Sequence, residues 1–243
     1  MKRNKSYITK DGVEVAILPM EIWKETQGMF TGVSHKLRPA IDVIGTYGIK
    51  DDVLASWTMK IFDVRATEVF TINVNPVLFR GLNGKHYIVE PGTAITKLYH
   101  DNYVKDLKVG QIIKQGTPFY QEGTYGNVAM HVHIEVGIYK PKSSTEYLAN
   151  KLSDGRYRVK GAVRLDEVYF SNDTDIQRTS YHWEEFPKEL LKDDNEIVIN
   201  GILDVPTIKA LQKRCGTTED GVISNPSSLV KEIQRRLISG EPI

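Results

Sequence analysis

The sequence predicts a mainly β protein, with an antiparallel sheet in the first two-thirds of the chain and a small, mostly α-helical C-terminal domain. Short apolar runs separated by Gly, Asn, Asp and Pro indicate the sheet, and helix signals are weak before residue 145. The tail contains an internal repeat with helical periodicity. We therefore expect a β domain over residues 1–170, a linker over residues 171–195 and a helical domain over residues 196–243.

The β domain is predicted from short strand patterns, taken in chain order. These patterns cover Ile41–Val43, Lys60–Val64, Val69–Val74, His86–Val89, Gln111–Lys114, Arg156–Val159 and Val168–Phe170. One short helix is predicted over Ser144–Leu152. From Ser171 to Asn195 the composition becomes polar and charged, which is typical of a linker.

A further strand pattern, His131-Val132-His133-Ile134-Glu135-Val136, carries the most chemistry. Alternate residues of a strand share one face, so this segment would point two imidazoles and a carboxylate the same way. Such a face is typical of a metal site that needs ligands from elsewhere in the chain. Glu135 either orients a ligand or lies at the solvated end of the strand without a role.

Composition excludes several classes of function. The 32 basic and 31 acidic residues nearly cancel, which disfavours nucleic acid and anionic membranes as partners. Cys215 is the single cysteine, so any zinc must be held by histidine and carboxylate. No stretch is apolar enough to span a bilayer, and Met1–Lys10 lacks the apolar core of a secretory signal.

The predicted C-terminal domain contains two copies of one pattern. Residues 200–207 recur twenty positions later as residues 220–227, and each copy pairs a turn dipeptide with a capping Asp or Ser and a Pro near the helix start. The apolar stripes are Ile208, Leu211 and Cys215, then Leu229, Ile233 and Leu237, and Gly216 and Gly240 suit the helix ends. On this pattern alone, a packing or dimerisation unit remains open.

His35 and Asp42 are the candidates for the remaining metal ligands. His35 lies in a predicted loop, and Asp42 lies in the apolar run that reads as a strand. A catalytic zinc uses three protein ligands and leaves one position for water, so two histidines and one aspartate give the right number.

The order of these motifs resembles that of a known family. The segments that carry the resemblance are Thr26-Gln27-Gly28, Ser34-His35, Ala40-Ile41-Asp42, Lys97-Leu98-Tyr99-His100, Leu107–Ile113, Gln115-Gly116 and His131–Val136. Over about residues 20 to 140 the chain resembles the LytM/lysostaphin-type zinc endopeptidases, the M23 family, and within it the phage endolysin branch, in which the first His and the Asp are seven apart.

The resemblance implies roles for individual residues. His35, Asp42 and His133 would bind one Zn²⁺, and His100 and His131 would be catalytic histidines that do not bind the metal. It implies a sheet that forms the floor of a peptide-binding groove with loops as walls. The implied reaction is hydrolysis of an amide bond in the peptide stem or cross-bridge of bacterial peptidoglycan. A phage endolysin would accumulate in the host cytoplasm before lysis and then reach the cell wall.

Further residues and the C-terminal repeat also have predicted roles. His86 is predicted to be a solvent-facing residue of an edge strand, and Tyr120 and Tyr125 are candidates for lining the groove. The C-terminal repeat loosely resembles a peptidoglycan-binding module, which would hold the enzyme at its insoluble substrate. An oligomer formed through this repeat also stays open.

One alternative comes from another class of protein. The family usually has glycine in the loop before its H-x-H, where residues 127–130 read Asn-Val-Ala-Met, and glycine is also common where this chain has Leu37. These departures are compatible with a non-catalytic wall-binding or virion structural protein that keeps the β fold. New amino termini in digested cell walls would exclude that alternative.

Overall fold

The computed structural model describes residues 6–81, 83–104, 106–168, 170–171, 177–178 and 203–242. The chain divides into two compact units, residues 1–191 and 192–243. Apart from residues 171, 177 and 178, the predicted linker over residues 171–195 lies outside the described residues. Neither α-helix in the described part of the chain has the length and apolarity needed to cross a membrane.

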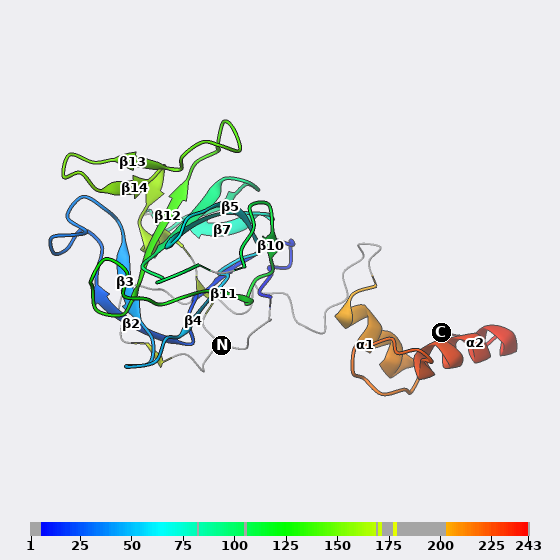
Figure 1. The fold of residues 1–243 in the computed structure, drawn as a ribbon. Coiled ribbons are helices and arrows are strands. Elements are labelled where there is room, and N and C mark those ends of the chain that lie inside the picture. The colour runs from blue at the N-terminus through cyan, green and yellow to red at the C-terminus, as the bar shows by residue number, and fades with distance from the viewer. Residues whose placement is uncertain are drawn as a thin grey trace. The chain divides into compact units, whose positions relative to one another are not determined.

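The first unit is built on one sheet of nine strands among the described residues, antiparallel except at one edge (Figure 1). In spatial order the strands are β10 (Ile112–Ile113), β5 (Met59–Val64), β6 (Glu68–Asn73), β9 (Ala94–Tyr99), β12 (Val132–Ile138), β3 (Ile41–Ile44), β2 (Ile22–Gln27) and β17 (Gln177–Arg178). The ninth strand, β15 (Ala162–Val163), pairs with β12 beyond the end of β3. The predicted mainly β, antiparallel architecture is confirmed.

Four two-stranded sheets and one 3₁₀ helix complete the described part of this unit. They are β1 (Ala16–Ile17) with β16 (Phe170–Ser171), β4 (Asp52–Leu54) with β11 (Pro118–Gln121), β7 (Val77–Arg80) with β8 (His86–Val89), β13 (Ala149–Lys151) with β14 (Tyr157–Val159), and η1 (Leu165–Glu167). The β13–β14 hairpin lies next to β12 (Figure 1). Of the strand predicted over Val168–Phe170, Phe170 lies in β16 and Val168 forms an isolated bridge with Phe79. The other strands predicted by pattern in this unit correspond to observed strands, with shifts at the ends.

The helix predicted over Ser144–Leu152 is wrong. Residues 142–145 form a bend and turn, and the chain then becomes strand β13. Leu148 and Ala149 are buried in a cluster with Phe70 and Ile95, which an extended segment paired with β14 can reach. Burial and cross-strand pairing therefore override the weak local preference for helix.

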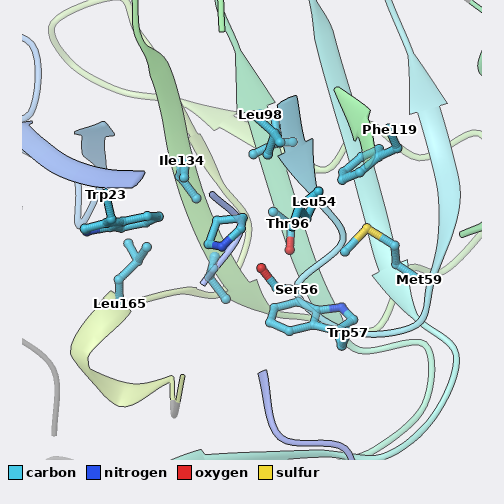
Figure 2. Close-up of a pocket in the computed structure, with 13 residues that line it drawn as sticks. Trp23, Leu54, Ser56, Trp57, Met59, Thr96, Leu98, Phe119, Ile134 and Leu165 are labelled. Atoms are coloured by element: carbon cyan, nitrogen blue, oxygen red, sulfur yellow. The ribbon is translucent and has the colours of Figure 1, made fainter. Parts of the chain in front are cut away.

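The two faces of the sheet have different roles. Ile134, Val136 and Leu98 face the main hydrophobic core, which Trp23, Trp57 and other large side chains fill; Figure 2 shows part of this packing. The opposite face carries His133 and Glu135 on β12, and the smaller apolar cluster under the β13–β14 hairpin covers part of it. The period of two along β12 thus separates a packing face from a chemical face.

Replacing Ile134 with alanine is expected to lower the free energy of unfolding by about 2–5 kcal/mol, because a fully packed side chain would leave a cavity. Ile134 is buried in the main core. Urea unfolding, measured with a chelator present so that metal binding does not contribute, gives the value. The matched control is Ile88→Ala on β8, where the side chain is half exposed. Equal losses for the two variants would contradict this account of the core.

The described part of the second unit contains two short helices, α1 (Val205–Arg214) and α2 (Ser228–Ser239). Asp204 caps α1 as predicted, since its carboxylate accepts a hydrogen bond from the Thr207 N–H at 3.1 Å. In the second copy the cap is Ser227, which accepts from the Val230 N–H at 3.2 Å. The capping Ser expected from the repeat, Ser224, bonds the Pro226 carbonyl instead, so α2 begins three residues later than the repeat predicts.

The apolar stripes of the repeat pack as predicted with one exception. Ile208, Cys215 and Leu229 are buried together, with Leu211 and Ile233 partly buried against them. Leu237, on the last turn of α2, is mostly exposed and lies outside this cluster. Gly240 ends α2 with φ 73°, the left-handed conformation in which glycine has no steric penalty.

Candidate metal centre

Sheet register brings Asp42 next to His133. β3 and β12 are antiparallel neighbours, and these two residues are directly paired. Paired residues of adjacent strands point to the same face, so the carboxylate and the imidazole meet on the chemical face of the sheet. His131 precedes β12 and forms an isolated bridge with Gly123, so the observed strand starts one residue later than predicted.

The loop between β2 and β3 adds His35 to this pair. Its Nε2 lies 3.1 Å from His133 Nδ1 and 3.1 Å from Asp42 Oδ1, and His133 Nδ1 lies 2.9 Å from the same Asp42 oxygen. All three residues are buried, with 0%, 8% and 3% exposure for His35, Asp42 and His133. Among the described residues, these three form the cluster whose ligand atoms converge within 4.8 Å.

The hydrogen bonds behind the two imidazoles determine which nitrogens carry hydrogen. His35 Nδ1 is 3.1 Å from the Gly28 carbonyl, and His133 Nε2 is 2.9 Å from a Glu135 carboxylate oxygen. Both of those oxygens only accept, so these nitrogens donate and the opposite nitrogens hold lone pairs. Three electron-pair donors therefore face one another, an arrangement that could hold a metal ion.

The donor set fits Zn²⁺. Imidazole nitrogen and carboxylate oxygen are ordinary zinc ligands, and two histidines with one aspartate leave a fourth position open. Ligand atoms around a tetrahedral zinc lie roughly 3.3 Å apart, and the separations here are 2.9–3.1 Å.

Glu135 is placed to orient His133, the first of the two options that the sequence left open. It lies two residues further along β12 and is completely buried. Burial raises its pKa, but the Lys97 ammonium at 3.0 Å and the His133 imidazole more than offset that effect. The carboxylate therefore stays ionised and can hold the His133 ring in one tautomer.

His100 and His131 lie beside the three converging residues with their rings 4.4 Å apart. His131 Nδ1 donates to the Ala129 carbonyl at 2.6 Å, and His100 Nδ1 donates to the Tyr125 carbonyl at 2.8 Å. Both Nε2 atoms are therefore left with lone pairs, and His131 Nε2 is 3.7 Å from Asp42 Oδ1. Burial lowers the pKa of His100 to about 4, so this imidazole is neutral at pH 7.

The loops that hold these two histidines have unusual backbone conformations. His100 has φ 92°, a strained value for any residue with a Cβ. The tight loop over it needs Gly123, where a Cβ would lie 2.0 Å from the His100 carbonyl oxygen. Asn127 has φ 59°, which asparagine tolerates better than most residues. In the loop before the H-x-H motif, asparagine therefore adopts the left-handed backbone conformation that glycine would otherwise provide.

A cavity of about 520 Å³ opens over this part of the sheet. Its lining includes Asp42, His133, His100 and His131, and also Gln27, Ser34, Arg38, Glu68, Lys97, Tyr99, Val128, Arg156 and Tyr157. The sheet thus forms the floor, while the loop before β3 and the β13–β14 hairpin contribute walls. A cavity of this size accommodates an extended segment of a few residues.

Several lining residues were not predicted from the sequence, and one candidate was misplaced. Tyr120 does not line the cavity; it is buried, and its hydroxyl bonds the Thr67 carbonyl at 2.7 Å. Tyr99 and Tyr157 are the aromatic residues of the lining. A lysine within the apolar strand β9, Lys97, was the sequence signal that could have indicated a buried charge network here.

His86 is exposed at the start of β8, as predicted, and lies outside the cavity lining. Tyr125 is half exposed and contributes its carbonyl, rather than a lining side chain, through the bond to His100. His182, the remaining histidine of the sequence, lies outside the described residues. The structure therefore brings together all five site residues predicted from the sequence and leaves His86 apart from them.

Comparison with known proteins gives structural similarity only. No family model matches the chain, and no curated protein matches it. The catalytic domain of the antimicrobial peptidase lysostaphin from Staphylococcus simulans aligns with a TM-score of 0.35 and 17% identity, over 51% of this chain and 85% of that one. A zinc-containing peptidase from Vibrio cholerae aligns with a TM-score of 0.34 and 16% identity, over 58% of this chain and 46% of that one.

A second lysostaphin structure from Staphylococcus simulans aligns with a TM-score of 0.33 and 15% identity, over 56% of this chain and 60% of that one. The aligned region thus spans less than two thirds of the Vibrio cholerae peptidase and of this second lysostaphin chain. Similarity at this level does not establish a family for the chain.

Proposed function

We propose that this chain is a zinc-dependent endopeptidase that hydrolyses an amide bond in the peptide stem or cross-bridge of bacterial peptidoglycan. The observation that carries the proposal is the convergence of three lone pairs, from His35, Asp42 and His133, beside two histidines whose Nε2 atoms remain available. Peptidoglycan as the substrate class is supported by the order of the sequence motifs, which resembles the LytM/lysostaphin type.

His35 Nε2, His133 Nδ1 and Asp42 Oδ1 would hold the ion. Zinc in such a site supplies a Lewis acid that polarises a carbonyl and lowers the pKa of water. The imidazoles of His100 and His131 can take the proton of the attacking water and return one to the leaving amine. When protonated, either ring can also stabilise the developing oxyanion, because both lie at the cavity beside the ligands.

The same proposal extends to a biological role. A phage endolysin, held in the host cytoplasm until lysis and then acting on the cell wall, agrees with the seven-residue spacing between His35 and Asp42. The predicted C-terminal domain, residues 196–243, would add affinity for the wall, because a tethered binding unit raises the local concentration of the enzyme at its substrate.

Digestion of purified cell walls tests the reaction directly. We expect the metal-loaded protein to clear a turbid wall suspension and to release fragments with new amino termini, which mass spectrometry of the muropeptides would locate. Chelation should stop the reaction and added Zn²⁺ should restore it. Released fragments with new reducing sugar ends and no new amino termini would contradict an endopeptidase, and binding to walls without any release would support a non-catalytic protein.

A further inference from the structure

Arg38 is a buried arginine in the segment between two of the converging residues, His35 and Asp42. Its Nε and Nη2 atoms donate to the Ser34 carbonyl at 3.0 and 2.5 Å. Its Nη1 donates to the Tyr157 carbonyl at 3.2 Å and to a Glu135 carboxylate oxygen at 3.5 Å. One guanidinium thus joins the loop that carries His35, the β13–β14 hairpin and the central strand.

Glu135 is the acceptor on which this arrangement depends. Its Oε1 accepts from His133 Nε2 at 2.9 Å and from Lys97 Nζ at 3.0 Å, in addition to Arg38. Its Oε2 accepts from the Val159 N–H at 2.8 Å. The carboxylate therefore links His133 to the same guanidinium that holds the loop of His35.

The charges of this buried network are balanced. Lys97 lies 3.8 Å from Glu68 as well as 3.0 Å from Glu135, so two cations, Arg38 and Lys97, face two carboxylates. Without Glu135, two positive groups would stand near a site for a divalent cation, where like charges repel strongly at low dielectric. Glu135 therefore offsets a repulsion that would weaken the binding of a cation at this position.

We propose that Arg38 and Glu135 are positioning residues that tie the His35 loop to the His133 strand, so that both imidazoles converge before the ion binds. The inference rests on the zinc site of the proposed function and deepens it. Neither side chain needs to touch the ion or the substrate. Their contribution is preorganisation: a loop that is already held loses less freedom when its histidine coordinates metal.

The test is the zinc affinity of the full chain, measured by competition with a chromophoric chelator. We expect Arg38→Met and Glu135→Gln to weaken zinc binding by about 10- to 100-fold. Arg38→Lys should fall between Arg38→Met and the wild type, because an ammonium keeps the charge but cannot span three acceptors. Arg158→Met is the matched control, since Arg158 donates to the Leu37 carbonyl at 3.2 Å in the same loop and does not contact Glu135 in any described bond.

Thermal melting of the metal-free variants distinguishes a positioning role of Arg38 and Glu135 from a contribution to the stability of the fold. A purely structural role would lower the melting temperature of the metal-free variants and leave the zinc affinity of the folded protein unchanged. That result, or equal weakening by Arg158→Met, would overturn the inference while the zinc peptidase proposal stands. If Arg38→Met does not fold, Arg38→Lys carries the same test. Absence of zinc binding by the wild type would instead remove the proposed function itself.

Discussion

Replacing His133 with alanine is expected to abolish zinc binding and to reduce wall hydrolysis by on the order of 1000-fold or more. His133 supplies one of the three converging lone pairs and lies on the central strand, where its other nitrogen is held by Glu135. Two remaining ligands do not hold zinc firmly. Loss of the Lewis acid removes several kcal/mol of transition-state stabilisation, and each 1.4 kcal/mol is about tenfold in rate.

Metal analysis after dialysis and a turbidity assay on purified walls measure the two effects together. His86→Ala is the control, because His86 is an exposed histidine on β8 outside the cavity lining and should leave both readings at the wild-type level. Circular dichroism establishes that each variant is folded. A His133→Ala protein that keeps stoichiometric zinc and still clears walls would contradict the metal centre.

The chemical face of β12 could be predicted from the sequence because it depends on a property of the backbone. Side chains alternate along any strand, so His133 and Glu135 had to share a face with apolar residues behind them. The pairing of Asp42 with His133 depends instead on the register of β3 against β12, between residues 91 positions apart. Spacing does not encode that register, and it was the order of motifs in the family resemblance that implied it.

The hydrogen bonds of Arg38 could not be predicted from the sequence. Its acceptors on Glu135 and Tyr157 are 97 and 119 residues away, on elements whose relative placement only the folded sheet determines. The failed helix over Ser144–Leu152 has the same origin, since Leu148 and Ala149 gain more by packing against Phe70 in extended form than the local preference offers. Local sequence patterns predicted secondary-structure elements, whereas contacts between residues far apart in the sequence determined the bonds of Arg38 and the extended form of Leu148 and Ala149.

His100→Ala and His131→Ala are each expected to keep zinc and to lose about 10²–10⁴-fold in the rate of wall hydrolysis, the usual contribution of a general acid or base. Both imidazoles are anchored through Nδ1 to backbone carbonyls, at 2.8 Å for His100 and 2.6 Å for His131, and neither belongs to the converging ligand set. Removing either ring therefore leaves His35, Asp42 and His133 in place. The measurement pairs zinc stoichiometry with initial rates on purified walls.

The double variant His100→Ala/His131→Ala decides whether the two rings work as one unit. Because the rings lie 4.4 Å apart and face the same cavity, we expect the double variant to lose little more activity than the more damaged single variant. If the activity losses of the two single variants instead multiply in the double variant, the two rings contribute independently to the rate. Loss of zinc in either single variant would place that histidine among the ligands, and wild-type rates in both would contradict the proton transfers proposed for this pair. His86→Ala again provides the control, because it removes an exposed imidazole outside the cavity lining.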